Sequence, residues 1–99
     1  MTTNTRESLR AKINLETSRI AWRELQRFFA AGAAVYVAAS LDLIEVATRI
    51  ANDDKAQVEL WMKQGLLGQV SDDQAHAWFN DDAELWAVVV KPWVLVQPV

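Results

Sequence analysis

The sequence predicts an α+β domain in which about five helices accompany a small three-stranded sheet. A long apolar run near the C-terminus, residues 85–97, is rich in β-branched and aromatic residues, which favours strand. Segments with capping residues and helical apolar spacing precede it. The chain has 99 residues, 52% of them hydrophobic and 23% charged, as expected for one globular domain. We therefore expect a single domain over 1–99, with an N-terminal helical arm at 1–14 and a core at 15–97.

The first third of the chain predicts two helices. Asn4 is a good N-cap, and Glu7 follows three residues later as in a capping box. A second helix is expected from residue 15 to about residue 31, because its apolar residues recur at helical spacing. Gly32 is a natural helix end.

The middle of the chain predicts a strand followed by two helices. Residues 33–39 are small and apolar, which favours a short buried strand. Ser40 is expected to cap the third helix, with Asp42 in its first turn, where a carboxylate is favoured. Asp54 is expected to start the fourth helix, which ends at Gly65. Its expected buried residues are Val58, Trp61 and Met62.

The last third predicts a strand, a short helix and the long strand. Residues 66–70 form the short strand, and Ser71 with Gln74 makes a capping box that opens the fifth helix. The run 85–97 is apolar on both alternating faces, which is typical of a strand buried on two sides. Lys91-Pro92 interrupts it, and we expect a bend within one strand. A hairpin is the alternative, although the turn lacks the glycine or asparagine that tight hairpins prefer.

Composition and charge exclude several classes of protein. The chain has no cysteine, which excludes disulfides, thiolate metal ligands and a thiol nucleophile. The first dozen residues do not resemble a secretory signal, and the longest apolar run is about half the roughly 20 residues of a membrane helix. We therefore expect a cytoplasmic protein without a membrane partner. Residues 51–99 carry three basic and eight acidic side chains, which argues against contact with a phosphate backbone.

Arginine recurs every four residues in the predicted second helix, at positions 19, 23 and 27. This spacing would place three guanidinium groups on one helix face. The face is interpreted either as solvated and ion-paired or as a surface for an anionic partner. In a second alternative, four of the charged side chains converge on a ligand pocket: Glu16, Arg19, Arg23 and Asp42. The candidate polar surface comprises Glu16, Arg19, Arg23, Arg27 and Asp42.

Sequence motifs for catalysis are absent. His76 is the one histidine, beside Trp78 and Phe79, and is interpreted as a packed or surface residue. The sequence has no nucleophile elbow, P-loop or dinucleotide fingerprint. Three Asp-Asp pairs, at 53/54, 72/73 and 81/82, lie at expected helix starts and turns, which favour aspartate; a Mg²⁺ or Ca²⁺ site is the alternative. We expect no catalytic residue, no metal and no cofactor.

Five tryptophans in 99 residues point to a large core and an interface. Trp22, Trp61 and Trp78 lie in apolar stripes and are assigned to the core. Trp86 and Trp93 are expected on opposite faces of the last strand, where three modest helices cannot cover both. We therefore predict a homodimer. Its candidate interface residues are Trp86, Trp93, Val94 and Leu95.

The order of the predicted elements from residue 15 resembles the winged-helix fold: helix, strand, helix, helix, strand, excursion, strand. The helix-turn-helix unit corresponds to Asp42–Ala51 and Val58–Leu67. The resemblance implies DNA binding through the second helix of the pair. That helix carries as many acidic as basic side chains, so nucleic acid is the least favoured partner. The excursion at 71–84 is also long for a wing.

A second resemblance spans nearly the whole chain. The segments that carry it are Glu16-Thr17 with Ile20-x-Trp22-x-Glu24-Leu25-x-Arg27-Phe28-Phe29-Ala30, Leu41-Asp42-Leu43, and Trp86-Ala87-Val88-Val89-Val90-x-Pro92-Trp93-Val94-Leu95-Val96-Gln97. In these the sequence is similar to DUF2288, a bacterial family of unknown function. The resemblance implies a cytoplasmic bacterial protein and supplies no activity, cofactor or site residue.

Three functions are therefore compared. The first is a homo-oligomeric protein-interaction or regulatory module without catalytic activity. The second is a small-ligand binder or enzyme, which requires the four charged side chains to converge on a cavity. The third, a winged-helix nucleic-acid binder, is the least favoured.

Overall fold

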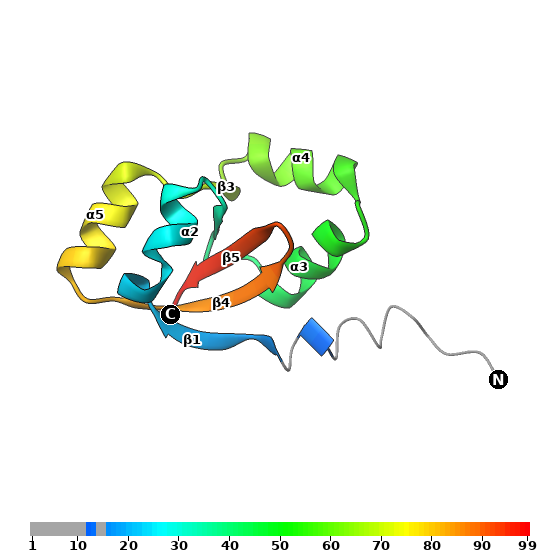
Figure 1. Ribbon diagram of the computed structural model, residues 1–99. Helices are drawn as coiled ribbons and strands as arrows, with labels where there is room; N and C mark the ends of the chain where they lie inside the picture. Colours follow the sequence, from blue (N-terminus) through cyan, green and yellow to red (C-terminus); the bar gives the residue numbers. More distant parts are fainter. Residues whose placement is uncertain (1–11, 14–15) are drawn as a thin grey trace.

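The computed structural model describes residues 12–13 and 16–99, and the sheet is its organising element (Figure 1). Residues 18–98 form five strands, one 3₁₀ helix and four α-helices. The strand order is β1-β4-β5-β2-β3, in which β2 and β5 are parallel and the other pairs antiparallel. The expected three-stranded sheet with five helices and winged-helix order is therefore wrong. Most of the expected N-terminal helical arm lies outside the described residues.

The elements follow the chain in a fixed order. The strands are β1 (Ser18–Ala21), β2 (Ala34–Val37), β3 (Leu67–Gln69), β4 (Glu84–Val90) and β5 (Trp93–Pro98). The helices are η1 (Trp22–Leu25), α2 (Gln26–Ala30), α3 (Leu43–Ala51), α4 (Lys55–Lys63) and α5 (Asp72–Asn80).

The predicted helix from residue 15 to 31 is replaced by three shorter elements: β1, η1 and α2. β1 pairs with the edge of β4, with Arg19 opposite Trp86. The pairing continues at Trp22, whose N–H donates to the carbonyl of Ala83 at 2.8 Å. The edge of β4 thus supplies backbone partners that outweigh the local helical spacing, and only α2 keeps the predicted helix.

The C-terminal run is a hairpin, so the expected bent strand is wrong. β4 and β5 pair antiparallel with Val90 opposite Trp93, and the turn contains a cis peptide bond between Lys91 and Pro92. Trp86 of β4 lies directly opposite Gln97 of β5, so these two side chains point to the same face. Side chains alternate along a strand, so Gln97 and Trp93, four residues apart, also share a face. Trp86 and Trp93 therefore lie on the same face of the sheet, and not on opposite faces.

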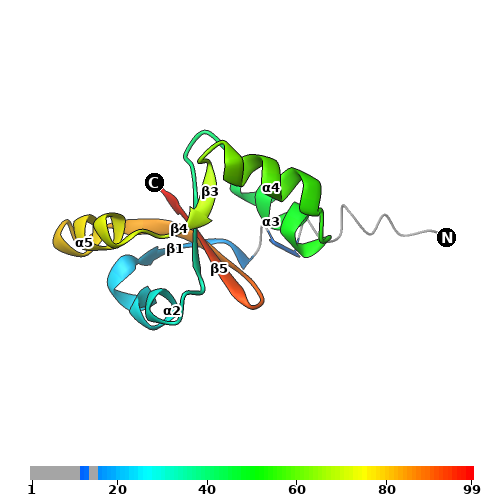
Figure 2. The same cartoon turned by 90° about the horizontal axis from the view of Figure 1, so that it is seen from above.

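The sheet is covered by helices on both faces (Figure 2). On one face, η1, α2 and α5 cover a cluster that includes Leu85, Ala87 and Val96. On the other, α3 and α4 lie over a second cluster that includes Val88 and Leu95. Both faces of β4 and β5 are thus used within the chain, which explains why this run is apolar in both alternating sets.

Trp22 is the centre of an aromatic group on the first face, as the sequence predicts. Its side chain is 0% exposed and makes edge-on contacts with Trp78 and Phe29, at centroid distances of 5.1 and 5.6 Å. Its indole N–H has no hydrogen-bond acceptor in the described structure. The group is therefore held by packing and ring geometry rather than by a hydrogen bond.

Capping side chains set where α3 and α5 begin. Asp42 Oδ1 accepts from the N–H groups of Ile44 at 2.9 Å and Glu45 at 3.3 Å, so Asp42, and not Ser40, caps α3. The structural role expected for Asp42 at a helix start is confirmed. The predicted capping box at Ser71 is present at the start of α5.

Candidate functional site

The candidate polar surface is dispersed. Arg19 on β1 pairs with Glu84 at 3.2 Å, and Arg23 on η1 pairs with Asp82 at 3.1 Å. The Arg27 guanidinium lies over the ring of Phe28, 4.8 Å from its centroid. The three arginines occupy three different elements, so the single helix face predicted for them does not exist.

The remaining two members of that surface lie elsewhere. Glu16 lines a shallow hollow beside the β4–β5 turn, together with Lys12 and Lys91. Asp42 is engaged in capping α3. The pocket that the second function requires, with Glu16, Arg19, Arg23 and Asp42 around one cavity, is not formed.

Helix α4 has an unusual place in the fold, because none of its nine residues is buried. It contacts α3 and β3 and stands apart from the centre of the sheet (Figure 1). Met62, which we expected to be buried, is 54% exposed, and Leu60 on the opposite flank is 49% exposed. Val58 and Trp61 pack against the second cluster and hold the helix in place, whereas Leu60 and Met62 stay largely uncovered.

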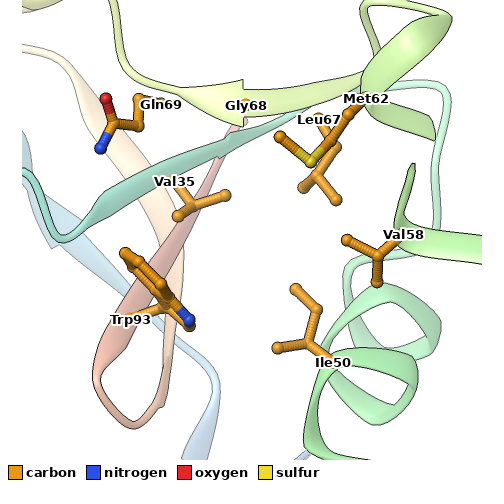
Figure 3. A pocket seen from close by; sticks show the side chains of 8 residues that line it. All are labelled: Val35, Ile50, Val58, Met62, Leu67, Gly68, Gln69 and Trp93. Carbon is orange, nitrogen blue, oxygen red and sulfur yellow. The ribbon is translucent and has the colours of Figure 1, made fainter. Parts of the chain in front are cut away.

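An apolar slot of about 520 Å³ lies between α4 and the sheet; we call it the α4 slot. Val35 and Trp93 of the sheet face Ile50, Val58 and Met62 across it (Figure 3). The other lining residues are Leu67, Gly68 and Gln69 of β3. The walls are therefore aliphatic, with one indole and one amide.

One end of the α4 slot is charged. Past Ile50 and Trp93 the slot continues into a hollow of about 340 Å³, lined also by Asp53, Asp54, Lys55 and Lys91. Within the described part of the chain, no carboxylate forms an ion pair with either lysine. We call this the lysine end of the slot.

The aspartate beside this end is already engaged. Arg49 hydrogen-bonds Glu45 and Asp54, each at 2.8 Å, and these bonds, with Glu45 first, raise the pKa of the Arg49 guanidinium. Asp54 also caps α4, where it accepts from the N–H of Gln57. Asp54 therefore shares one guanidinium with Glu45, and the hollow is lined by two lysines and two aspartates.

The four candidate interface residues divide into two pairs. Val94 and Leu95 are buried inside the domain, on opposite faces of β5, and cannot reach a partner in this fold. Trp86 and Trp93 are each 38% exposed, the latter in the wall of the α4 slot. The hairpin explains the difference, because it places Val94 and Leu95 in the centre of the sheet.

Trp86 belongs to a second exposed area at the β1 edge of the sheet. The guanidinium of Arg19 lies 5.8 Å from its ring centroid and is paired with Glu84. Val99 is also exposed and follows Pro98, which pairs with the neighbouring Leu85. We call Trp86, Val99, Arg19 and Glu84 the Trp86 patch.

Sequence reasoning missed the α4 slot for a physical reason. Its walls come from α3, α4, β2, β3 and β5, so the site exists only once distant segments are together. The available signal was α4 itself, in which Leu60, Trp61 and Met62 are consecutive and so cannot all lie on one helix face. Val58, which we expected to be buried, is half-buried and lines this open site.

Three further features concern residues 12–13 and 16–99. His76 is exposed in a hollow between α2 and α5, beside Asp72 and Asn80. Among the described residues, no three histidine, aspartate or glutamate side chains are grouped so that they could hold a metal ion. In the same part of the chain, no helix has the length and apolar character needed to cross a membrane.

Comparisons with known proteins agree with this fold. The solution structure of PA1075 from Pseudomonas aeruginosa is similar with a TM-score of 0.80 and 46% identity, over 98% of this chain and 90% of that one. The comparison with curated proteins gives no match. The model of a family described as protein of unknown function, DUF2288, matches residues 8–98. This chain therefore belongs to the DUF2288 family.

Proposed function

We propose that this protein is a non-catalytic protein-interaction module of the cytoplasm that acts as a homodimer. The observation that carries the proposal is helix α4, which has no buried residue and stands beside the apolar α4 slot. Continuous exposed apolar surface marks interaction sites in soluble proteins, because water contact with it is unfavourable. Tryptophan and methionine, present here as Trp93 and Met62, are enriched in such surfaces.

The placement of the charged side chains supports binding over catalysis. A catalytic site needs several functional groups within hydrogen-bond reach of one reacting atom. Arg19 and Arg23 are instead paired with Glu84 and Asp82, on different sides of η1. Asp42 is used to begin α3. The alternative function, a small-ligand binder or enzyme, therefore lacks the cluster of charged side chains that it requires.

The homodimer is assigned to the Trp86 patch. A twofold interface uses the same patch on both chains, so the patch must be complementary to itself. This patch joins an exposed indole to one positive and one negative side chain, Arg19 and Glu84. Rotation by 180° can bring each arginine to the partner's glutamate while the two indoles cover one another. β1 is also the outer strand of the sheet, so no further strand stands in the way.

Sedimentation velocity at tens of micromolar tests the dimer. We expect a mass twice that of the 11.2 kDa chain. Trp86→Lys should shift the protein to the monomer, because a charge would enter an apolar contact. Leu60→Lys is the control, since Leu60 is also an exposed apolar residue and lies on α4, outside the patch. A wild-type protein that sediments as one chain at every concentration would contradict the homodimer.

Photo-crosslinking tests the interaction module separately. A benzophenone amino acid placed at Met62, in the slot wall, should capture a discrete partner band in cells of the native bacterium. The same probe at Leu60, on the other flank of α4, should not. Equal labelling at both positions would show that the slot has no partner of its own.

A further inference from the structure

We infer that β1 pairs antiparallel with the β1 of a second copy, in a register that places Arg19 opposite the partner's Ala21. This inference rests on the proposed function and specifies how the two chains of the homodimer meet. The two sheets then form one continuous sheet, with both Trp86 patches on the same face. The pairing follows from the backbone groups of β1, its side chains and twofold symmetry.

The outer edge of β1 is open to a further strand. β1 is an end strand of the sheet and forms its lower margin in Figure 1. The N–H of Trp22 donates to the Ala83 carbonyl at 2.8 Å, and bonded pairs alternate along an antiparallel ladder. Ile20 therefore bonds β4, whereas Arg19 and Ala21 direct their backbone groups outward. Outward groups of this kind are a template for strand addition.

The side chain of Arg19 leaves this edge uncovered. A charged side chain often protects an edge strand from pairing. Here the guanidinium pairs with Glu84 at 3.2 Å and lies 5.8 Å from the centroid of the Trp86 ring. Both of these residues belong to β4, so Arg19 is turned toward the sheet and away from the outer edge. The backbone of β1 thus remains accessible to a partner strand.

Side-chain charge selects the register of the pairing. Antiparallel pairing about a twofold axis in the middle of β1 can be centred on Arg19 or on Ile20. An axis at Arg19 would place two guanidinium groups directly opposite each other, which is destabilising. An axis at Ile20 places each Arg19 opposite the methyl group of the partner's Ala21. It also brings the two Ile20 side chains together as an apolar pair.

The backbone groups match in this register. The outward N–H of each Ala21 donates to the outward carbonyl of the partner's Arg19, and symmetry repeats the bond. Ala21 is also the N-cap of η1, so its carbonyl accepts the first bond of that helix. A carbonyl oxygen has two lone pairs, and the second is left for the N–H of the partner's Arg19.

The acidic side chain of the Trp86 patch is in the same row. Glu84 lies opposite Ala21 in the pairing of β1 with β4. In the dimer, Arg19 is therefore followed across the sheet by the partner's Ala21 and then by the partner's Glu84. Because Ala21 is small, the guanidinium can cross its methyl group and meet that carboxylate. The ion pair within each chain is thus exchanged for two pairs between the chains.

Proline at position 21 tests the strand pairing. Ala21 has φ −64°, the value that proline requires, and its N–H points outward, so the chain should still fold. Ala21→Pro removes both donors that cross the axis and should weaken the dimer by at least about tenfold in sedimentation velocity. Asp72→Pro is the control, since proline is tolerated at the first position of a helix. Far-UV circular dichroism of both variants should match wild type.

Cysteine cross-linking tests the register. The chain has no cysteine, so each variant carries a single thiol. Ile20→Cys would place two thiols at a non-hydrogen-bonded pair with Cα atoms about 4.5 Å apart, within reach of a disulfide. Ser18→Cys, two residues away on the same face, is the control, because its Cα atoms would be about 14 Å apart. Mild oxidation should link Ile20→Cys into dimers and leave Ser18→Cys monomeric on a denaturing gel.

The outcomes separate this inference from the proposed dimer. A wild type that sediments as one chain would remove the homodimer and the strand pairing with it. A dimer that persists in Ala21→Pro, or that is not linked through Ile20→Cys, would keep the homodimer and overturn the strand pairing. Equal linking of Ile20→Cys and Ser18→Cys would overturn the register. In a lysate of the native bacterium, a disulfide from Ile20→Cys to another protein in place of a second copy would overturn the inference.

Discussion

Gln97 is hydrogen-bonded to Leu41: its side-chain Nε2 donates to the Leu41 carbonyl at 2.6 Å and also to that of Ala38 at 2.9 Å. Gln97 is only 9% exposed, so these bonds form in the interior. They tie the last strand to the segment that leads into α3.

Replacement of Gln97 should therefore lower the stability of the fold. We expect Gln97→Leu to lower the free energy of unfolding by about 1–3 kcal/mol, because two buried carbonyls lose their donor. Gln97→Glu should cost more at pH 7, where the carboxylate faces two acceptors. Below the unfolded glutamate pKa of about 4.3 the acid is neutral and has one O–H donor, so this excess cost should shrink as the pH falls. Urea denaturation at pH 7 and pH 4 measures both. Equal costs at the two pH values would contradict the donor role.

Trp22 is expected to contribute by volume alone. Trp22→Ala should cost about 3–5 kcal/mol, the range for a large aromatic removed from a core. Trp22→Phe should cost much less, because the indole N–H has no acceptor to lose. Denaturant melts of both variants, compared with wild type, measure this. A Trp22→Phe cost as large as that of Trp22→Ala would point to a hydrogen bond that the structure lacks.

The cap of α3 provides a direct comparison of two neighbouring residues. Asp42→Ala should lower stability by about 1 kcal/mol, because the N–H groups of Ile44 and Glu45 lose their acceptor. Ser40→Ala should change it by less than about 0.5 kcal/mol, since Ser40 is exposed and outside the helix. Thermal denaturation followed by circular dichroism separates the two. A larger effect at Ser40 would show that the helix begins earlier.

Charge reversal tests the twofold use of the Trp86 patch. Arg19→Glu and Glu84→Arg should each weaken the dimer about tenfold, because like charges would meet across the axis. The double variant should recover wild-type association. Each single change should alter chain stability by at most about 1 kcal/mol, since the pair within one chain is exposed. Sedimentation equilibrium gives the dissociation constants. No recovery in the double variant would place the interface elsewhere.

The sequence predicted the parts of the fold that depend on neighbouring residues. The capping residues Asp54 and Ser71, with the helix end at Gly65, locate α4 and α5, and small apolar residues locate β2. These signals act within a few residues, so they survive in the folded chain.

The predictions that were wrong concern segments whose structure depends on contacts with distant parts of the chain. Ser18–Ala21 is a strand only because the edge of β4 lies beside it, and its arginine spacing imitates a helix. The hairpin at Lys91-Pro92 lacks the glycine or asparagine that tight hairpins prefer, so its presence depends on β5 pairing with both β4 and β2. Met62 looked buried because its spacing matches an inner face, whereas α4 stands off the sheet. The α4 slot could not be predicted either, because its walls come from segments that are distant in the sequence.

The central place of β5 has a consequence for synthesis of the chain. The pair β1–β4 and the pair β2–β3 make no strand contact with each other, and β5 alone joins them. A nascent chain that has reached residue 90 contains four strands and all of the described helices, yet its two half-sheets have no strand that joins them. The domain can close only after residues 93–98 have left the ribosome. Until then the apolar faces of β2 and β4 are open to chaperones, so the emergence of β5 sets the moment at which the domain becomes independent of them.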